Sequence, residues 1–351
     1  MKVVIDEKIP YLYDALTAMG LDVVPLPGVS IKNGDLTDTD ALFVRTRTKC
    51  NRELLAGTGV RFIGSATIGY DHIDADYCRE NDIVWTNAAG CNAGAVLQYV
   101  QSVVYCWARK EKRTIAGLTL GVVGFGEIGS RVAAWSRRVG MKVLVNDPPK
   151  ADAGTAGLVS LAEIAEKCDI ITFHPTLNAT GPYRSFHLAD EAFFDSLRCC
   201  KLLINASRGE VVDNEALLVA MEKGKVGCVA LDVWENEPDI SIPLLNKVYI
   251  ATPHIAGYSA EGKMNATAMV LDAFVRFVEY KGTVRQLSLE APESPFVRAV
   301  DEQEALLSIY SPLDDTAALK KAPMDFENLR NSYKLRREPG AYEFEITGNC
   351  D

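Results

Sequence analysis

The sequence is short of histidine and contains no hydrophobic run long enough to suggest a membrane anchor. Four of its 351 residues are histidine. The apolar stretch from Ala93 to Ala108 is too short to span a bilayer and contains glutamines. The N-terminal MKVVIDEKIP carries acidic residues and lacks the apolar core of a signal peptide. We therefore expect a cytoplasmic protein without a membrane-spanning segment.

Positive charge is also in deficit. The net charge of −10 argues against nucleic acid or an anionic membrane as a main partner, although it leaves room for a local basic pocket that binds a small anion. The nine cysteines show no metal-ligand spacing, and an odd number without a secretory signal is typical of reduced thiols. We therefore predict no metal site and interpret the cysteines as packing residues.

What the sequence does contain is an alternation of short apolar runs and helical stretches. A first series extends from KVVI to DIVWTN, and a second extends from LTLGVVGFGEIG to VYIATPH. A long helical pattern, GAVLQYVQSVVYCWARKEKR, separates them. Strands that alternate with helices indicate parallel sheets covered on both faces. We therefore predict an α/β protein with two Rossmann-like, doubly wound parallel-sheet domains.

The composition changes after residue 285. The segment EAPESPFV is typical of a linker, and the remaining residues are charged and less regular. A packing extension or dimerisation arm is the favoured interpretation of this end of the chain, ahead of a regulatory site. We predict a substrate-binding domain from residues 1–90 and 258–285, a dinucleotide-binding domain from residues 91–257, and a small C-terminal α+β dimerisation module from residues 286–351.

A glycine-rich turn opens the second series. It has the spacing G-x-G-x-x-G, follows an apolar strand and begins a helix, and the next strand ends in Asp147 at roughly the expected distance of about 20 residues. The glycines let the backbone approach a pyrophosphate at the helix N-terminus. Asp147 would accept hydrogen bonds from ribose hydroxyls and repel a 2′-phosphate, which favours NAD over NADP. The turn comprises Gly124, Phe125, Gly126, Glu127, Ile128 and Gly129.

Polar residues follow three successive buried strands of the second series. They are Arg208, Glu237 and His254. In open α/β sheets, ligands bind at the carboxyl ends of the strands. A guanidinium suits a carboxylate, and an imidazole paired with a carboxylate can take a hydroxyl proton as a hydride leaves. We therefore predict a hydride-transfer site for a hydroxy acid, with Asp232 accepting from the carboxamide of the nicotinamide.

A basic loop follows a strand of the first series. VRTRTK places Arg45, Arg47 and Lys49 among small hydroxyl residues. On so acidic a chain this cluster is either a solvated loop or an anion pocket. As a pocket, it would hold a phosphate away from the reacting carbon, which supplies remote binding energy for orienting the substrate.

The stretches GFGEIG…ND, NASRGEVVDNEAL, LDVWENEP and TPHIAGYS together resemble the D-isomer-specific 2-hydroxyacid dehydrogenases. The resemblance implies that Arg208 and Glu237 are catalytic, that His254 accepts the proton in oxidation, and that the chain forms a homodimer through its C-terminal module. It also implies two sets of contacts. NAD is expected at Asp147, Thr176, Ala206, Asp232 and Gly257 besides the glycine turn, and the substrate at Arg45, Thr46, Thr67 and Tyr258.

The chain departs from this family at one point. The family usually has His-Thr-Pro after the strand that ends at Phe173, whereas this chain has His174-Pro175-Thr176, so the NAD-contacting threonine is displaced. His174 would touch the cofactor or belong to a structural turn. For His72 and His187 no charged partner is visible in the sequence, and His187 is expected to cap or pack near a helix start.

Three functions remain open from the sequence. The first is NAD-dependent oxidation of a phosphorylated 2-hydroxy acid at its C2 hydroxyl. The second is a related dehydrogenase for phosphoglycerate, glycerate or lactate. The third is a non-catalytic protein that senses NAD, like the corepressors that adopt this fold.

Overall fold

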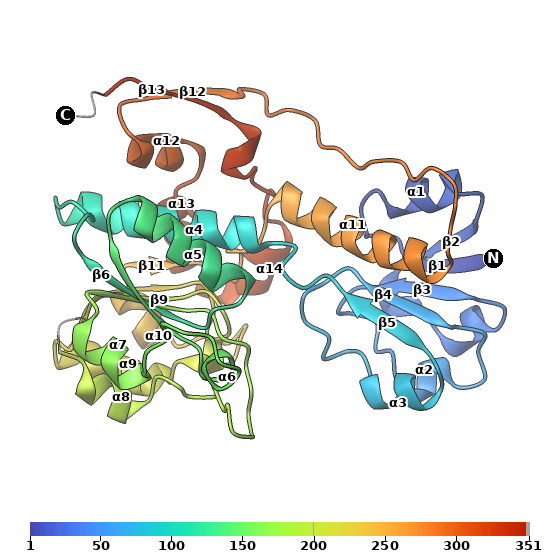
Figure 1. The fold of residues 1–351 in the computed structure, drawn as a ribbon, viewed down its shortest axis with the longest axis horizontal. Coiled ribbons are helices and arrows are strands. Elements are labelled where there is room, and N and C mark those ends of the chain that lie inside the picture. Colours follow the sequence, from blue (N-terminus) through green and yellow to red (C-terminus); the bar gives the residue numbers. More distant parts are fainter. Residues whose placement is uncertain (199, 349–351) are drawn as a thin grey trace. The chain divides into compact units, whose positions relative to one another are not determined.

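The computed structural model describes residues 1–198 and 200–348, which fold into two compact units. The first unit contains Met1–Asn92 and Ser259–Ala291, and the second contains Ala93–Tyr258 and Pro292–Asp351 (Figure 1). Each unit is built around a parallel sheet with helices on both faces. The predicted α/β fold class is confirmed.

The first unit has a five-stranded parallel sheet in the order β2-β1-β3-β4-β5. Successive side chains of its strands serve opposite faces. Val3 and Phe43 pack with helices α1 and α11, whereas Val4 and Leu42 pack with α2 and α3. The strands are β1 (Lys2–Asp6), β2 (Asp22–Leu26), β3 (Ala41–Val44), β4 (Phe62–Ser65) and β5 (Val84–Asn87). The helices are α1 (Leu12–Ala18), α2 (Arg52–Leu55), α3 (Ala75–Glu80) and α11 (Ala260–Phe277), with 3₁₀ turns at Gly28–Ser30 and Asn33–Leu36.

The second unit has a six-stranded parallel sheet in the order β11-β10-β9-β8-β6-β7. Strands β7 and β8 pair with opposite edges of β6, so the strand order reverses at β6, the position where doubly wound sheets bind dinucleotides. The strands are β6 (Thr119–Val123), β7 (Lys142–Asn146), β8 (Ile170–Phe173), β9 (Cys200–Asn205), β10 (Val226–Leu231) and β11 (Ile250–Ala251).

Helices cover both faces of this second sheet. Helices α4 and α5 pack on one face, and α7 to α10 pack on the other. They are α4 (Ala93–Lys110), α5 (Glu127–Arg138), α6 (Pro148–Asp152), α7 (Leu161–Lys167), α8 (Glu191–Ser196), α9 (Asn214–Glu222) and α10 (Ile242–Lys247), with a 3₁₀ turn at Gly209–Val211. The long helical pattern in the sequence thus forms α4, whose middle is buried almost all round.

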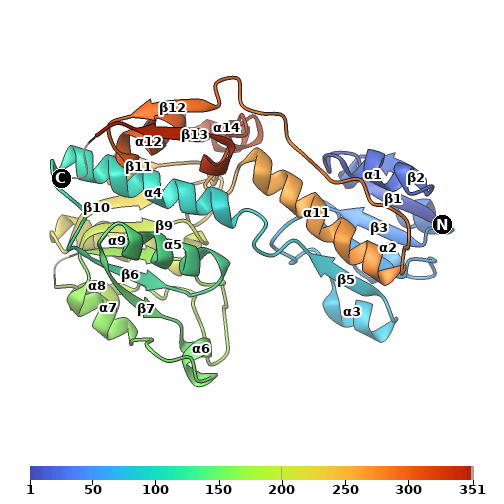
Figure 2. The same ribbon diagram turned by 45° about the horizontal axis from the view of Figure 1, so that its top comes forward.

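The C-terminal segment forms a small module of helices and strands within the second unit. Its predicted α+β class is confirmed. Its strands β12 (Phe296–Ala299) and β13 (Glu343–Ile346) pair in parallel and lie side by side in Figure 2. Helix α12 packs on α4, and α13 packs beside β11. The helices are α12 (Glu302–Ile309), α13 (Pro312–Lys321) and α14 (Phe326–Asn331), with 3₁₀ turns at Pro323–Asp325 and Pro339–Ala341.

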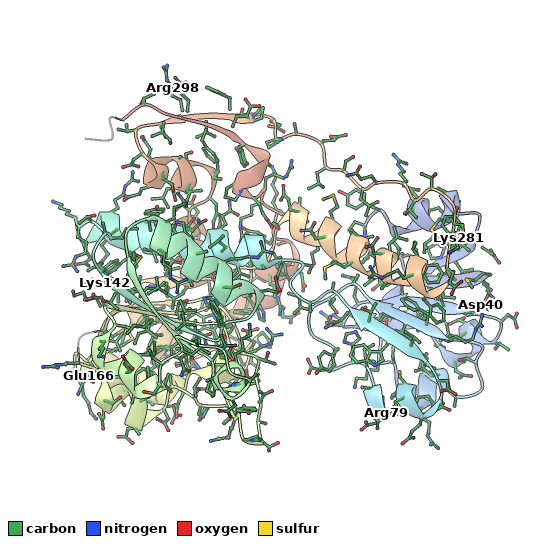
Figure 3. All side chains as sticks on the ribbon, viewed as in Figure 1. Asp40, Arg79, Lys142, Glu166, Lys281 and Arg298 are labelled. Atoms are coloured by element: carbon green, nitrogen blue, oxygen red, sulfur yellow. The ribbon has the colours of Figure 1, made fainter. Side chains whose placement is uncertain are left out.

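Charged side chains cover the outside of each unit, as Lys142 and Glu166 do in Figure 3. Of the described cysteines, six are buried and Cys228 is half-buried, whereas Cys199 and Cys350 lie outside the described residues. Among residues 1–198 and 200–348, no helix is both long enough and apolar enough to cross a bilayer.

Candidate active site

The glycine turn lies between β6 and α5, and two of its glycines are required by close packing. Gly124 has φ +91, and a Cβ there would lie 2.6 Å from the carbonyl carbon of His174. A Cβ on Gly129 would lie 1.9 Å from the carbonyl oxygen of Gly124. A Cβ on Gly126 would meet nothing within 4 Å, so the backbone is open at that position, as a pyrophosphate requires.

Asp147 is held against this turn. Its Oδ2 accepts a hydrogen bond of 2.7 Å from the backbone N–H of Phe125, and its Oδ1 accepts one of 3.0 Å from Lys150 as the cap of α6. The Lys150 ammonium in turn donates to the carbonyl of Phe125. The carboxylate therefore lies at the end of β7 beside the glycine turn. The accessible backbone at Gly126 and the fixed carboxylate of Asp147 together fit a dinucleotide whose adenosine ribose carries no 2′-phosphate.

His254 and Glu237 form a hydrogen-bonded pair at the carboxyl edge of the same sheet. His254 follows β11 and Glu237 follows β10, which are adjacent strands. The imidazole Nδ1 donates to Glu237 Oε2 over 2.8 Å, and Glu237 Oε1 accepts from the backbone N–H of Trp234 over 2.9 Å. The carboxylate therefore fixes the ring orientation, and the second nitrogen, Nε2, is left to exchange a proton with a substrate.

The loop that carries His254 is set by Asp232. His254 has φ 58, in the left-handed region that non-glycine residues rarely adopt, and its N–H donates to the carbonyl of Asp232 over 2.8 Å. The buried carboxylate of Asp232 accepts from Thr252, Ile255 and Ala256. Burial raises the pKa of Asp232. Asp232 therefore organises the loop that carries His254, a role that the sequence did not reveal.

Arg208 follows β9, the next strand in the sheet, and its loop is organised by Asn205. The Asn205 amide donates to the carbonyl of Arg208 over 2.9 Å, and its oxygen accepts from Ser207 Oγ over 2.8 Å. The half-buried guanidinium donates to the carbonyl of Ser207 over 2.8 Å. A Cβ on Gly209 would lie 1.9 Å from the carbonyl oxygen of Trp234, so the Arg208 and Glu237 loops touch through backbone alone.

His174 lies at the end of β8 behind the glycine turn. It is nine-tenths buried, its Nε2 is 2.9 Å from Thr172 Oγ1, and its buried Nδ1 has no hydrogen-bond partner among the described residues. Burial lowers its pKa to about 3, so the ring is neutral at ordinary pH. The displaced Thr176 is exposed, and its carbonyl accepts from Ser185. Ala206 is buried, whereas Gly257 is half-buried.

The predicted substrate residues are divided between the two units. Arg45, Thr46 and Thr67 belong to the first unit, and Tyr258 belongs to the second. Arg45 Nε donates over 2.9 Å to Asp6, whose carboxylate is buried and balances the guanidinium charge. Thr46 is exposed.

Thr67 is tied to a small polar cluster in the first unit. Its hydroxyl lies 2.8 Å from Ser65 Oγ, which is also 2.9 Å from His72 Nε2. Burial lowers the pKa of His72.

His187 has charged partners that the sequence did not reveal. Its Nε2 lies 2.6 Å from Glu235 Oε1, and its Nδ1 lies 3.5 Å from Asp213. Glu235 also accepts from the backbone N–H of Asn214 at the start of α9 over 2.8 Å. These partners come from separate loops, so no short-range pattern could have identified them. They give His187 a structural place between the loops after β9 and β10.

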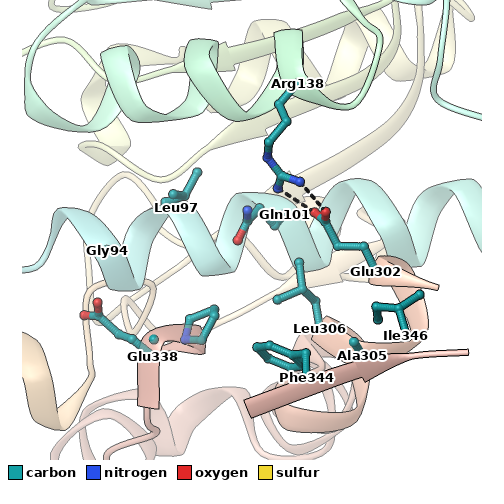
Figure 4. A pocket seen from close by; sticks show the side chains of 12 residues that line it. Gly94, Leu97, Gln101, Arg138, Glu302, Ala305, Leu306, Glu338, Phe344 and Ile346 are labelled. Carbon is teal, nitrogen blue, oxygen red and sulfur yellow. Dashed lines mark hydrogen bonds and ion pairs between the residues drawn. The ribbon is translucent and has the colours of Figure 1, made fainter. Parts of the chain in front are cut away.

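A pocket of about 430 Å³ lies elsewhere in the second unit, between α4, α12 and the C-terminal strand β13 (Figure 4). Leu97, Leu306 and Phe344 supply apolar wall, and Arg138 pairs with Glu302 at one end over 2.6 Å. None of the predicted site residues lines this pocket.

The doubly wound sheet with its glycine turn defines a domain that binds a dinucleotide. Residues 95–256 match the family model described as D-isomer specific 2-hydroxyacid dehydrogenase, NAD binding domain. The chain is 48% identical over 343 residues to the erythronate-4-phosphate dehydrogenase of Bacteroides thetaiotaomicron, covering 97% of this chain and 98% of that protein. It is 42% identical to the enzyme of the same name from Proteus mirabilis, with 96% and 93% covered.

A solved structure agrees with these relatives. The D-lactate dehydrogenase of Aquifex aeolicus, complexed with NAD and lactic acid, shares 25% identity and a TM-score of 0.60, with 80% of this chain and 96% of that chain covered. The chain therefore belongs to the D-isomer-specific 2-hydroxyacid dehydrogenase family. It is an NAD-dependent oxidoreductase whose substrate is a hydroxy acid, and the prediction of NAD as cofactor is confirmed.

Proposed function

We propose that the protein oxidises 4-phospho-D-erythronate at its C2 hydroxyl to 2-oxo-3-hydroxy-4-phosphobutanoate, with NAD, in pyridoxal 5′-phosphate (vitamin B6) biosynthesis. The observation that carries this proposal is the similarity to erythronate-4-phosphate dehydrogenases, 41–48% identical over nearly the full chain. The C-terminal module falls within the matched length, since the Bacteroides relative covers 97% of this chain.

The proposed chemistry assigns one role to each of three side chains. His254 Nε2 takes the C2 hydroxyl proton, and Glu237 stabilises the imidazolium through the 2.8 Å bond to Nδ1. Arg208 holds the substrate carboxylate, for which its planar guanidinium is suited. The glycine turn and Asp147 would hold NAD, which would supply the acceptor for the hydride that leaves C2 with its electron pair. The products are then the 2-oxo acid, the reduced cofactor and a protonated His254, which balances the reaction.

The phosphate is proposed to bind at the basic loop after β3. Arg45 is paired with Asp6, and the loop also carries Arg47 and Lys49, which are both exposed. Hydroxyl groups from Thr46, Thr67 and Tyr258 would complete the substrate contacts. The NAD contacts that we propose are the glycine turn, Asp147, Thr176, Ala206, Asp232 and Gly257. A phosphoglycerate, glycerate or lactate dehydrogenase is the alternative, since it would use the same three catalytic side chains.

A substrate panel tests the proposal. Purified protein with NAD is expected to turn over 4-phospho-D-erythronate with a kcat/KM well above those for phosphoglycerate, glycerate and lactate. His254→Ala is expected to lower kcat by roughly 10² to 10⁴-fold, because the base is lost, while NAD binding measured by fluorescence is unchanged. Preference for an unphosphorylated acid would contradict the substrate assignment. Absence of turnover from every acid would instead favour an NAD-sensing protein.

Two further features stay predictions. A homodimer formed through the C-terminal module is supported by the exposed apolar residues Phe296, Phe344 and Ile346 on β12 and β13. A cytoplasmic location follows from the sequence.

A further inference from the structure

Arg330 reaches the His254–Glu237 pair from the C-terminal module. It lies on α14, near the end of that short helix. Its Nε donates to the hydroxyl of Tyr258 over 3.2 Å, and its Nη1 lies 3.8 Å from Glu237 Oε2. All of these residues belong to the second unit, and the Arg330 side chain is 29% exposed.

The same oxygen of Glu237 therefore faces two nitrogen groups. His254 Nδ1 is 2.8 Å away and Arg330 Nη1 is 3.8 Å away, while the other oxygen is occupied by the Trp234 N–H. Burial opposes the charge on Arg330, but Tyr258, Glu237 and Asp232 together raise its pKa. Arg330 is thus a fixed cation beside the carboxylate that must stabilise the imidazolium.

The module is anchored firmly enough to hold this geometry. Phe326, at the start of α14, is buried in the core on the face of the sheet that α7 to α10 cover. The buried guanidinium of Arg336 donates to the carbonyls of Ile255, Ala256 and Tyr258, which lie in the loop after His254. It also donates to the carbonyl of Ala95 and the amide of Gln98 on α4. The loop between His254 and α11 is therefore clamped by the C-terminal segment.

We propose that Arg330 is a positioning residue for proton transfer, which acts through Glu237 and Tyr258 to orient the His254–Glu237 pair and to balance the negative charge beside the imidazole. The proposal rests on the proposed function, since it takes His254 as the proton acceptor. It makes the C-terminal module a part of the catalytic apparatus besides its expected role in dimerisation.

The sign of the effect follows from the charges around the imidazole. Glu237 and the buried Asp232 favour the imidazolium, Arg330 disfavours it, and the Tyr258 hydroxyl is held by Arg330. Removing the guanidinium leaves the two carboxyl groups unopposed, so a positive charge on the imidazole ring is stabilised further. Oxidation needs the neutral ring, so its acid limb moves upward in pH.

Arg330→Met removes the charge and keeps much of the length, Arg330→Lys keeps the charge, and Arg276→Met serves as control. Arg276 lies on α11 and pairs with Asp272 on the surface, with 72% of its side chain exposed. For Arg330→Met we expect kcat/KM to fall about tenfold and the acid limb of its pH profile to rise by roughly half a pH unit. Arg330→Lys is expected to keep the acid limb at its wild-type pH but to retain only part of the wild-type kcat/KM. Arg276→Met is expected to match the wild type.

The comparison uses whichever 2-hydroxy acid the wild type oxidises, so a different substrate would overturn the substrate assignment without affecting this test. Binding of oxamate, a 2-oxo acid analogue that accepts from protonated histidine, gives a readout without turnover. In the NADH complex, oxamate binding weakens as the pH rises. For Arg330→Met this weakening is expected at a pH about half a unit higher than for the wild type. Unmoved pH dependence in both experiments would overturn the proposal, as would an equal shift in Arg276→Met.

Discussion

At the scale of residues, two histidines at strand ends of one sheet differ in what surrounds them. His254 has a carboxylate partner and is 27% exposed, whereas His174 has a hydroxyl partner and is nine-tenths buried. Proton exchange with a substrate requires both access and a group that stabilises the charged ring. His254 has both, and His174 has neither, so His174 is suited to packing behind the glycine turn.

Burial of His174 predicts a specific acid sensitivity. Its pKa is lowered to about 3 in the folded protein. Below about pH 6.5 the His174 ring is therefore protonated in the unfolded chain but stays neutral in the folded chain. The free energy of unfolding therefore falls as pH decreases from 6.5 towards 3. In His174→Gln this contribution is absent, and the loss of stability between pH 7 and pH 5 is expected to be smaller by about 2 kcal/mol. Urea unfolding at the two pH values measures it, and parallel losses in both proteins would contradict it.

At the scale of elements, the loops after β9 and β10 meet through backbone at Gly209. Because a Cβ at this position would lie 1.9 Å from the carbonyl oxygen of Trp234, Gly209→Ala must separate the Arg208 loop from the loop that carries Glu237. We expect kcat/KM to fall by about 10²-fold, since small displacements of catalytic groups are costly, while NAD still binds. Gly34→Ala, where a Cβ meets nothing within 4 Å, is the control. Full activity of Gly209→Ala would show that the two loops need not touch.

The elements also show what the sequence could reveal. The strand ends that carry Arg208, Glu237 and His254 were predictable, because each follows an apolar run and breaks at polar residues. Strand β2 has no clear strand pattern in the sequence because Pro25 interrupts it, and the structure places this strand at a sheet edge, where a missing N–H is tolerated. The contacts of Arg330 and Arg336 join residues far apart in the chain, so local patterns contain no trace of them.

At the scale of the whole molecule, the β12–β13 pair suggests where copies of the chain would associate. Two strands alone are marginally stable, and their edges present unpaired backbone groups. Phe296, Phe344 and Ile346 are exposed on this pair by 58%, 37% and 45%. Phe344 and Ile346 share one face of the pair, whereas Phe296 is paired with Glu343 and so lies on the opposite face. Exposed apolar side chains of this size are typical of an interaction surface, and the homodimer prediction gives them an occupant.

A charge on this surface separates assembly from catalysis. Sedimentation of the wild type is expected to give twice the chain mass of 38.4 kDa, and Phe296→Asp is expected to give the monomer, because burying an unpaired carboxylate is costly. Val29→Asp, at an apolar residue 73% exposed in the first unit, is expected to stay dimeric. Since Arg330 and Arg336 contact the His254 loop of their own chain, the folded monomer is expected to retain turnover. A well-folded monomer without turnover would mean that the partner subunit completes the site.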